Sequence, residues 1–150
     1  MLKLLFSFLV IFSIFTSPVM AEVNSHVPTE AELQQGESIA QMAISATEKG
    51  DFVEAEKYWT QLVEQFPDNP AVWSNRGNAK ISQNKVAEAI ADYDQSIILA
   101  PDAPDPYLNR GVAYEALGEF DSAIADYQKV LELDPEDAMA YNNLGNANAG

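Results

Sequence analysis

The residues that could do acid–base or metal chemistry are few in this chain, and their spacing matches no catalytic pattern. The chain has one histidine, His26, with no acid–base partner around it, and no cysteine, so catalytic triads, zinc sites and iron–sulfur clusters are not expected. Acidic side chains gather at 102–105 and 132–137, where an acid stabilises the positive start of the following helix without any catalytic role. The sequence therefore predicts no catalytic residue, no metal site and no cofactor, and a protein that is not an enzyme.

The charge of the chain excludes two further classes of site. The 150 residues carry 23 Asp and Glu against 8 Lys and Arg, which gives a net charge of −15. A nucleic-acid interface needs clustered bases to neutralise phosphates, and docking on an anionic membrane surface needs them too. We expect neither partner, and we interpret the acidity as a contribution to solubility. Hydrophobic residues make up 47% of the chain, which indicates a folded core.

The first 21 residues have the features of a secretion signal. A lysine precedes an apolar run at 4–15, Pro18 breaks the run, and Val-Met-Ala at 19–21 has the compact residues of a cleavage site. The run is shorter than the roughly 20 residues that a membrane-spanning helix needs. We expect 1–21 to be a signal peptide that is removed on export, with an uncleaved N-terminal membrane anchor as the alternative.

The strongest pattern in the sequence is an internal repeat with a period of 34 residues. Aromatic residues, an asparagine, a glycine, an alanine and a proline recur at this spacing. The recurring sets include Trp73, Tyr107 and Tyr141; Asn75, Asn109 and Asn143; Gly77, Gly111 and Gly145; Ala55, Ala89 and Ala123; and Pro67, Pro101 and Pro135. The repeat defines a lead-in at 22–35, full units at 36–69, 70–103 and 104–137, and a partial unit at 138–150.

Each unit is predicted to form two antiparallel helices. In the third unit prolines stand in the first turn, where a missing N–H costs little, Gly118 ends the first helix and Pro135 ends the second. Thr29 and Glu32 have the spacing of a capping box, so a helix that starts near Glu30 should run from the lead-in into the first unit. Because no unit can bury its apolar face alone, the units must stack. The predicted fold class is all-α, a right-handed superhelical solenoid of antiparallel helix pairs.

These repeating positions resemble the tetratricopeptide repeat (TPR) family. That family has an aromatic residue at position 4 of each unit, Gly at 8, Tyr at 11, Ala at 20, an aromatic at 24 and Pro at 32. The third unit matches it with Tyr107, Gly111, Tyr114, Ala123, Tyr127 and Pro135. The resemblance covers 36–150 and implies a non-catalytic scaffold that binds another protein and aids assembly of a larger complex. Short exported members from cyanobacteria and plastids are similar in layout, which implies the periplasm or the thylakoid lumen.

The resemblance also implies that five positions of each unit's first helix line a concave groove. From the second unit onward these positions hold two acids and no base, so the Lys and Arg with which chaperone-binding members hold a C-terminal carboxylate are missing. We expect an extended peptide or the face of a helix in the groove instead. The candidate groove residues are Ser74, Asn75, Asn78, Leu108, Asn109, Val112, Asn142, Asn143 and Asn146.

Two alternatives to this interpretation remain open at the level of the sequence. The recurring asparagines could equally hydrogen-bond from helix to helix within the stack. The protein as a whole could be a self-associating structural module, because repeat stacks often assemble through their exposed ends.

Two other positions change together from unit to unit. Position 7 is Arg and position 23 is Asp in the second and third units, whereas the first unit has Met42 and Tyr58 at these positions. Coupled change of this kind is expected of side chains that touch, so we predict two ion pairs with a structural role. The predicted pairs are Arg76–Asp92 and Arg110–Asp126.

The partial fourth unit ends after its first helix. Solenoids normally finish with a polar capping helix that covers the last apolar face. We therefore expect the chain to be a fragment of a longer protein, with a last helix at 138–149 that frays in isolation. On that expectation nothing covers the far side of the helix, which carries Met139, Tyr141, Leu144 and Ala147.

Overall fold

The computed structural model describes residues 27–148, which form seven α-helices and no strand. The helices are α1 (Glu30–Glu48), α2 (Phe52–Gln65), α3 (Pro70–Ile81), α4 (Val86–Leu99), α5 (Pro104–Ala116), α6 (Phe120–Leu133) and α7 (Ala138–Ala147). The predicted signal peptide at 1–21 lies outside the described residues. None of the helices within 27–148 combines the length and the apolar character that crossing a bilayer requires.

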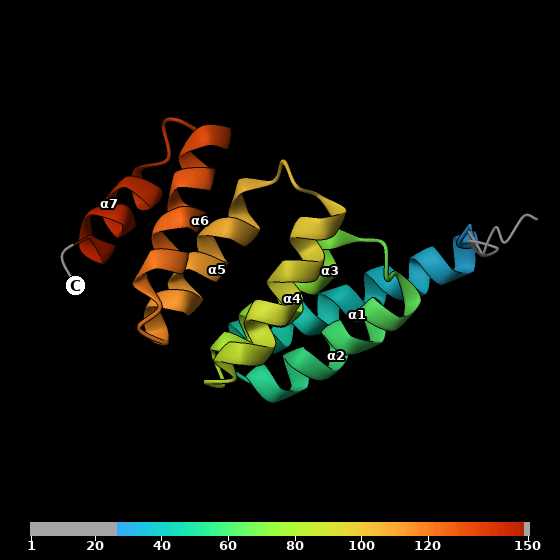
Figure 1. Ribbon diagram of the computed structural model, residues 1–150. Helices are drawn as coiled ribbons and strands as arrows, with labels where there is room; N and C mark the ends of the chain where they lie inside the picture. The colour runs from blue at the N-terminus through green and yellow to red at the C-terminus, as the bar shows by residue number, and fades with distance from the viewer. Residues whose placement is uncertain (1–26, 149–150) are drawn as a thin grey trace, which may run out of the picture.

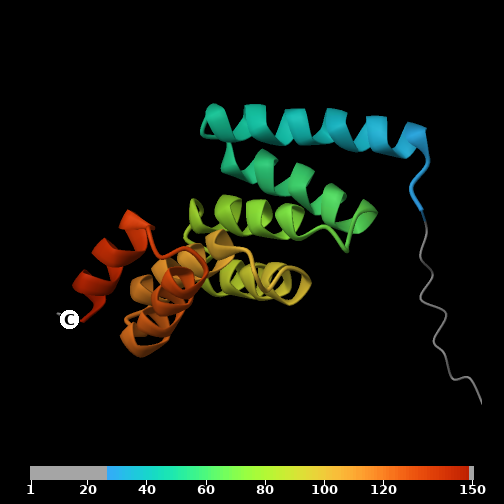
Figure 2. The ribbon, with the colours of Figure 1, turned by 90° about the horizontal axis from the view of Figure 1, so that it is seen from above.

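The helices pack in the order in which they follow along the chain (Figure 1). α1 pairs with α2, α3 with α4 and α5 with α6, while α2–α3, α4–α5 and α6–α7 contacts join one pair to the next. Seen from above, the last three helices are turned relative to the first four, so the stack winds as it extends (Figure 2). The predicted all-α solenoid of antiparallel helix pairs is confirmed.

The start of α1 shows how local sequence sets a helix boundary. Thr29 Oγ1 accepts a hydrogen bond from the Glu32 N–H at 3.3 Å, and the Glu32 carboxylate accepts one from the Thr29 N–H at 2.7 Å. This capping box satisfies two backbone donors that would otherwise lack partners. α1 therefore begins at Glu30, as predicted, and continues without a break through the boundary between lead-in and first unit.

The turn between the two helices of each unit needs a residue in the left-handed region of backbone space. Gly50 has φ of 75° and Gly118 has φ of 76°, and in the second unit Asn84 takes the same place with φ of 62°. Glycine adopts this conformation at little cost, and asparagine is among the few other residues that tolerate it. The three turns therefore share one geometry although their sequences differ.

The glycine at position 8 lets the two helices of a unit approach closely. A Cβ atom on Gly77 would lie 2.7 Å from the Tyr93 ring, and one on Gly111 would lie 2.5 Å from the Tyr127 ring. Such distances are well inside van der Waals contact, so the ring fills the space that a side chain would need. Gly145 in α7 is different, because no atom of a neighbouring element lies within 4 Å of the equivalent position.

The apolar interior is divided into three clusters along the stack. The first joins α1, α2 and α3, and the last joins the third unit with α7. The middle cluster is small, with Ala89, Tyr93 and Ala113 as its buried members. In the last cluster Ala147 is buried and Leu144 partly buried, so only part of α7 lacks cover. Met139 and Tyr141 remain exposed.

Candidate binding groove

Three hollows lie along the first helices of the three units. One of about 340 Å³ lies between α3 and α5, one of about 210 Å³ between α1 and α3, and one of about 350 Å³ between α1 and the start of α3. Asn75 lines all three, and Asn78 lines the first two. We call this set of hollows the groove, and Asn75 stands at its centre.

The amide side chains of the groove fall into two kinds. Asn78 Oδ1 accepts a hydrogen bond from the Tyr93 hydroxyl at 2.8 Å and another from Asn109 Nδ2 at 3.3 Å. These bonds join α3 to α4 and α3 to α5, so Asn78 and Asn109 support the stack. The half-buried Asn75 makes no side-chain hydrogen bond within residues 27–148, which leaves its amide available to a ligand.

The structure brings some of the predicted groove residues together and separates others. Ser74, Asn75, Asn78 and Asn109 line the hollow between α3 and α5. Leu108, which was also predicted to line the groove, lines none of the three hollows, and its side chain is buried in the last apolar cluster. The remaining predicted residues lie outside the three hollows, with side chains that are at least partly exposed: Val112, Asn142, Asn143 and Asn146.

Sequence reasoning missed the contribution of the first unit to the groove. Ile44 and Thr47 of α1 line the hollow between α1 and α3, together with Trp59 of α2. Ile44 and Thr47 stand at positions 9 and 12 of their unit, two of the groove positions that were considered only from the second unit onward. Extending the same groove positions to the first unit by the 34-residue period would therefore have predicted both residues.

The charged side chains that line the groove are all acidic. Glu37 and Glu48 contribute from α1 and Asp105 from α5, and no Lys or Arg lines any of the three hollows. Deeper in the stack, burial raises the pKa of Tyr93, with a further contribution from the neighbouring Asp92 carboxylate. Tyr93 therefore stays a neutral hydroxyl donor to Asn78 at any physiological pH.

The repeat pattern and the helix hairpins have counterparts in known proteins. Two family models described as tetratricopeptide repeat match the sequence, one at residues 41–104 and one at 78–142. The chain belongs to the tetratricopeptide repeat family. Among proteins with curated descriptions, none matches this sequence.

Solved TPR structures share the fold over most of both chains. The first TPR domain of Spaghetti (RPAP3), bound to the HSP90 peptide SRMEEVD, is 28% identical with a TM-score of 0.75, covering 77% of this chain and 92% of that one. The second TPR domain of human RPAP3, in complex with the HSP70 peptide SGPTIEEVD, is 25% identical with a TM-score of 0.74, covering 78% and 98%. The TPR domain of Arabidopsis OM64 is 20% identical with a TM-score of 0.76, covering 79% and 98%.

The two predicted ion pairs of the TPR units are present. Arg76 donates to Asp92 from Nε at 2.9 Å and from Nη2 at 2.6 Å, and Arg110 donates to Asp126 in the same two-pronged way at 2.8 and 2.6 Å. Both aspartates are buried. Planar, two-pronged pairing of this kind is the strongest geometry available to a guanidinium and a carboxylate.

Each TPR ion pair has a further member that the sequence did not reveal. The Nζ of the buried Lys80 lies 2.9 Å from Asp92 Oδ2, the oxygen that also accepts from Arg76 Nε. Asp94 of α4 accepts a hydrogen bond from Arg110 of α5, so this arginine joins the second unit to the third. The hydrogen bond to Asp126 raises the pKa of Arg110 and outweighs the opposing effect of burial, and the bond to Asp94 adds to it.

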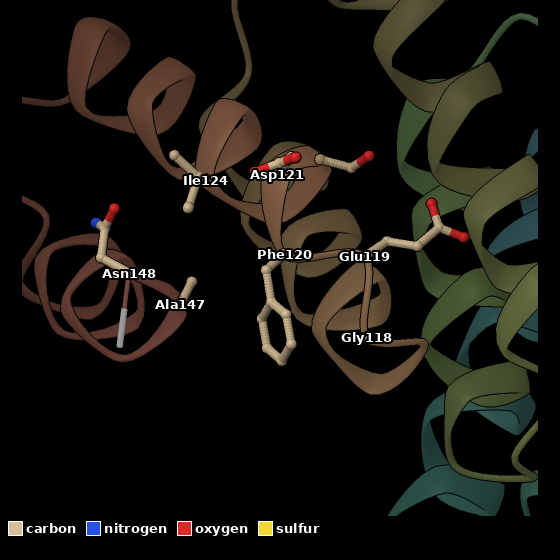
Figure 3. A pocket seen from close by; sticks show the side chains of 8 residues that line it. Gly118, Glu119, Phe120, Asp121, Ile124, Ala147 and Asn148 are labelled. Atoms are coloured by element: carbon tan, nitrogen blue, oxygen red, sulfur yellow. The ribbon is translucent and has the colours of Figure 1, made fainter. Parts of the chain in front are cut away.

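A further hollow of this TPR stack lies at its end and not in the groove. It has a volume of about 670 Å³ and lies between the start of α6 and the end of α7, lined among others by Phe120, Ile124 and Ala147 (Figure 3). Its two carboxylates, Glu119 and Asp121, are exposed. No cluster of three or more His, Cys, Asp or Glu suited to a metal ion occurs within residues 27–148.

Proposed function

We propose that this TPR protein is a non-catalytic interaction module that binds an extended segment of another protein along α1, α3 and α5. The observation that carries the proposal is the position of Asn75, which lines all three hollows of the groove with an amide that has no partner in the described chain. An amide offers donors and an acceptor, so it can pair with a peptide backbone of any sequence. Apolar side chains such as Ile44 would supply the remaining contact.

The character of the bound segment follows from the charges of the groove. The related RPAP3 domains hold the acidic peptides SRMEEVD and SGPTIEEVD. Here the charged residues that line the groove are Glu37, Glu48 and Asp105, with no base among the lining residues, so an acidic peptide would meet like charge. We therefore propose a neutral or basic segment as the ligand, and a role in holding a partner during assembly of a larger complex.

The compartment belongs to the same proposal. The signal-like segment at 1–21 favours export to a periplasm or thylakoid lumen. The alternative is that this segment is not cleaved and anchors the protein in the membrane that bounds the compartment. Binding partners should therefore be sought among the proteins of such a compartment.

The test is a peptide selection with a matched pair of variants. The full chain is used to select binders from a random peptide library, and the enriched peptides are measured by titration against wild type, Asn75→Ala and Gln95→Ala. We expect neutral or basic peptides whose affinity falls about tenfold in Asn75→Ala, the value of one or two hydrogen bonds. Gln95 is exposed on α4 and serves as the matched amide control, so its variant should bind as wild type does.

A further measurement and the contradicting outcomes complete this test. The helical circular dichroism of Asn75→Ala should equal that of wild type, because the Asn75 amide makes no hydrogen bond within the described stack. Enrichment of acidic peptides with a free C-terminal carboxylate, or equal affinity of wild type and Asn75→Ala, would contradict the proposed groove.

A further inference from the structure

The groove changes character along its length, because the hollow between α1 and the start of α3 is apolar. Its lining includes Trp59, Leu62 and Val72, which are buried, and Leu33, which is half exposed. We call this hollow the apolar pocket. It is enclosed by α1, α2 and α3, so it lies between two consecutive units. Its volume of about 350 Å³ is at the lower end of the range of ligand pockets, which suits one large side chain.

The neighbouring hollow between α3 and α5 is polar, and one position of the repeat shows the difference. Position 27 is Leu62 in the first unit, where it lines the apolar pocket, and Ser96 in the second, where it lines the polar hollow. Asn78 and Asn109 add their amides to the polar hollow, and Asn75 lines both hollows. The groove therefore holds an apolar site and a polar site side by side, with one amide that both share.

A close contact that is particular to the first unit shapes the apolar pocket. A Cβ atom on Gly36 would lie 2.5 Å from the ring of Phe66, so the ring occupies space that only a glycine leaves free. Gly36 and Phe66 both line the pocket, at positions 1 and 31 of their unit. The other two full units have proline at position 1 and alanine or aspartate at position 31, and they stack without such a contact. The repeat itself therefore does not require the pair, which is a feature of the pocket.

The charge of the apolar pocket indicates what lies next to its occupant. Glu37 is the one charged residue among those that line it, and it is exposed and in no ion pair of the described chain. A cation beside the occupant would pair with Glu37, whereas a carboxylate there would be repelled. The lining thus combines burial for an apolar side chain with attraction for a neighbouring base.

We propose, on the basis of the groove function proposed above, that the apolar pocket takes one large aliphatic or aromatic side chain of the bound segment. A Lys or Arg next to that side chain in the segment faces Glu37. The Asn75 amide pairs with backbone of any sequence, so it does not fix where along the groove a segment binds. The apolar pocket does, and it is the part of the groove that determines specificity.

The test uses the peptides that the full chain enriches from the random library. We expect these peptides to share Leu, Ile, Met or Phe at one position, with Lys or Arg beside it. Replacing that apolar residue of the peptide by Ala should weaken binding to wild type about tenfold or more, the value of burying one such side chain.

Two matched variants show whether the pocket is the cause of this loss. In Leu33→Ser, which removes an exposed part of the lining, the loss should shrink to a few-fold. In Val53→Ser, which removes an exposed apolar side chain of α2 that lines no hollow of the groove, the full loss should remain. Because each loss compares two peptides on the same variant, a change in the folded fraction cancels.

A charge reversal tests the second half of the proposal. Glu37→Lys and Glu64→Lys change the net charge equally, and neither glutamate lies in an ion pair of residues 27–148. Glu37→Lys should prefer peptides with Glu in place of the Lys or Arg beside the apolar residue, whereas Glu64→Lys should keep the wild-type preference.

The outcomes separate this pocket from the groove function on which it rests. Peptides that bind and weaken in Asn75→Ala, yet share no apolar position, overturn the pocket alone. An equal loss in wild type and Leu33→Ser overturns it too. If the full chain enriches no peptide at all, the groove function fails and the pocket falls with it.

Discussion

The Asp92 carboxylate lies between two cations, the Arg76 guanidinium and the Lys80 ammonium. Its pairing with Arg76 could be predicted because positions 7 and 23 differ together from the first unit. Lys80 was not found in this way, because only one unit has a base at position 11 and a single departure cannot show what it touches. Asp94 was missed for another reason, since its contact with Arg110 depends on how one unit is rotated against the next.

At this site the two partners of the predicted ion pair should differ in importance. Asp92→Asn leaves the buried Lys80 and the partly buried Arg76 without their carboxylate and should cost about 3 kcal/mol of the free energy of unfolding. Arg76→Met should cost only about 1–2 kcal/mol, because Lys80 still neutralises Asp92. Urea denaturation followed by circular dichroism measures both values.

A combined variant tests whether apolar side chains can replace this charged cluster. Arg76→Met, Lys80→Ala and Asp92→Tyr together copy the residues that the first unit has at positions 7, 11 and 23. Because apolar residues of similar volume often replace a buried ion cluster without loss, the triple variant should be more stable than Asp92→Asn alone. A triple variant as damaged as that single one would show that the cluster does more than pair charges.

At the scale of the helices, the boundaries followed from capping residues, prolines and turn glycines, whereas the direction of single side chains did not. Position 5 of the unit illustrates the difference. Ser74 lines the groove, Leu108 turns into the core and Asn142 is exposed, although all three occupy one place in the repeat. Whether such a side chain is buried depends on its size and polarity and on the neighbours of its unit. A periodic sequence pattern does not give the rotation of one unit against the next, so it cannot predict these neighbours.

The second helices of the units differ in how they begin. Asp51 caps α2 by accepting a hydrogen bond from the Glu54 N–H at 3.2 Å, whereas Glu119 precedes α6 with nearly the same backbone angles and makes no such bond. Glu119→Asp shortens the side chain to the length that caps α2. We expect it to raise the free energy of unfolding by about 0.5–1 kcal/mol. Thermal unfolding of the variant measures the gain.

The natural cap supplies the control for this prediction. Asp51→Ala should lower stability by about 1 kcal/mol through loss of the existing bond. If Asp51→Ala lowers stability but Glu119→Asp lowers it too, an aspartate does not cap α6 as it caps α2, and the prediction is wrong.

At the scale of the whole molecule, the excess of 23 acids over 8 bases acts on every unit at once. Repulsion among exposed acids favours the expanded, unfolded chain, and salt screens it, whereas the buried pairs are screened much less. The melting temperature of the monomer should therefore rise by a few degrees between about 10 mM and 150 mM salt, where the screening length falls from about 30 Å to about 8 Å. Differential scanning calorimetry at low protein concentration measures this shift.

A variant with fewer charges checks the origin of that salt effect. Glu64 and Glu136 are exposed and their side chains lie in no ion pair of the described chain. Glu64→Gln with Glu136→Gln should raise the melting temperature at low salt and reduce its dependence on salt. A melting temperature that falls as salt is added would instead mean that surface ion pairs outweigh the repulsion.

The division of the interior into three clusters should make the two ends of the stack stiffer than its middle. The first and last clusters are broad and apolar, whereas the middle is joined by a small cluster, the Arg110–Asp94 pair and the Asn109–Asn78 bond. Polar links can lengthen and re-form at lower cost than a packed apolar contact can open. We therefore expect bending to concentrate between α3 and α5, where the hollow of about 340 Å³ lies, so that the groove would change its curvature to suit a ligand while the first and last clusters keep their shape.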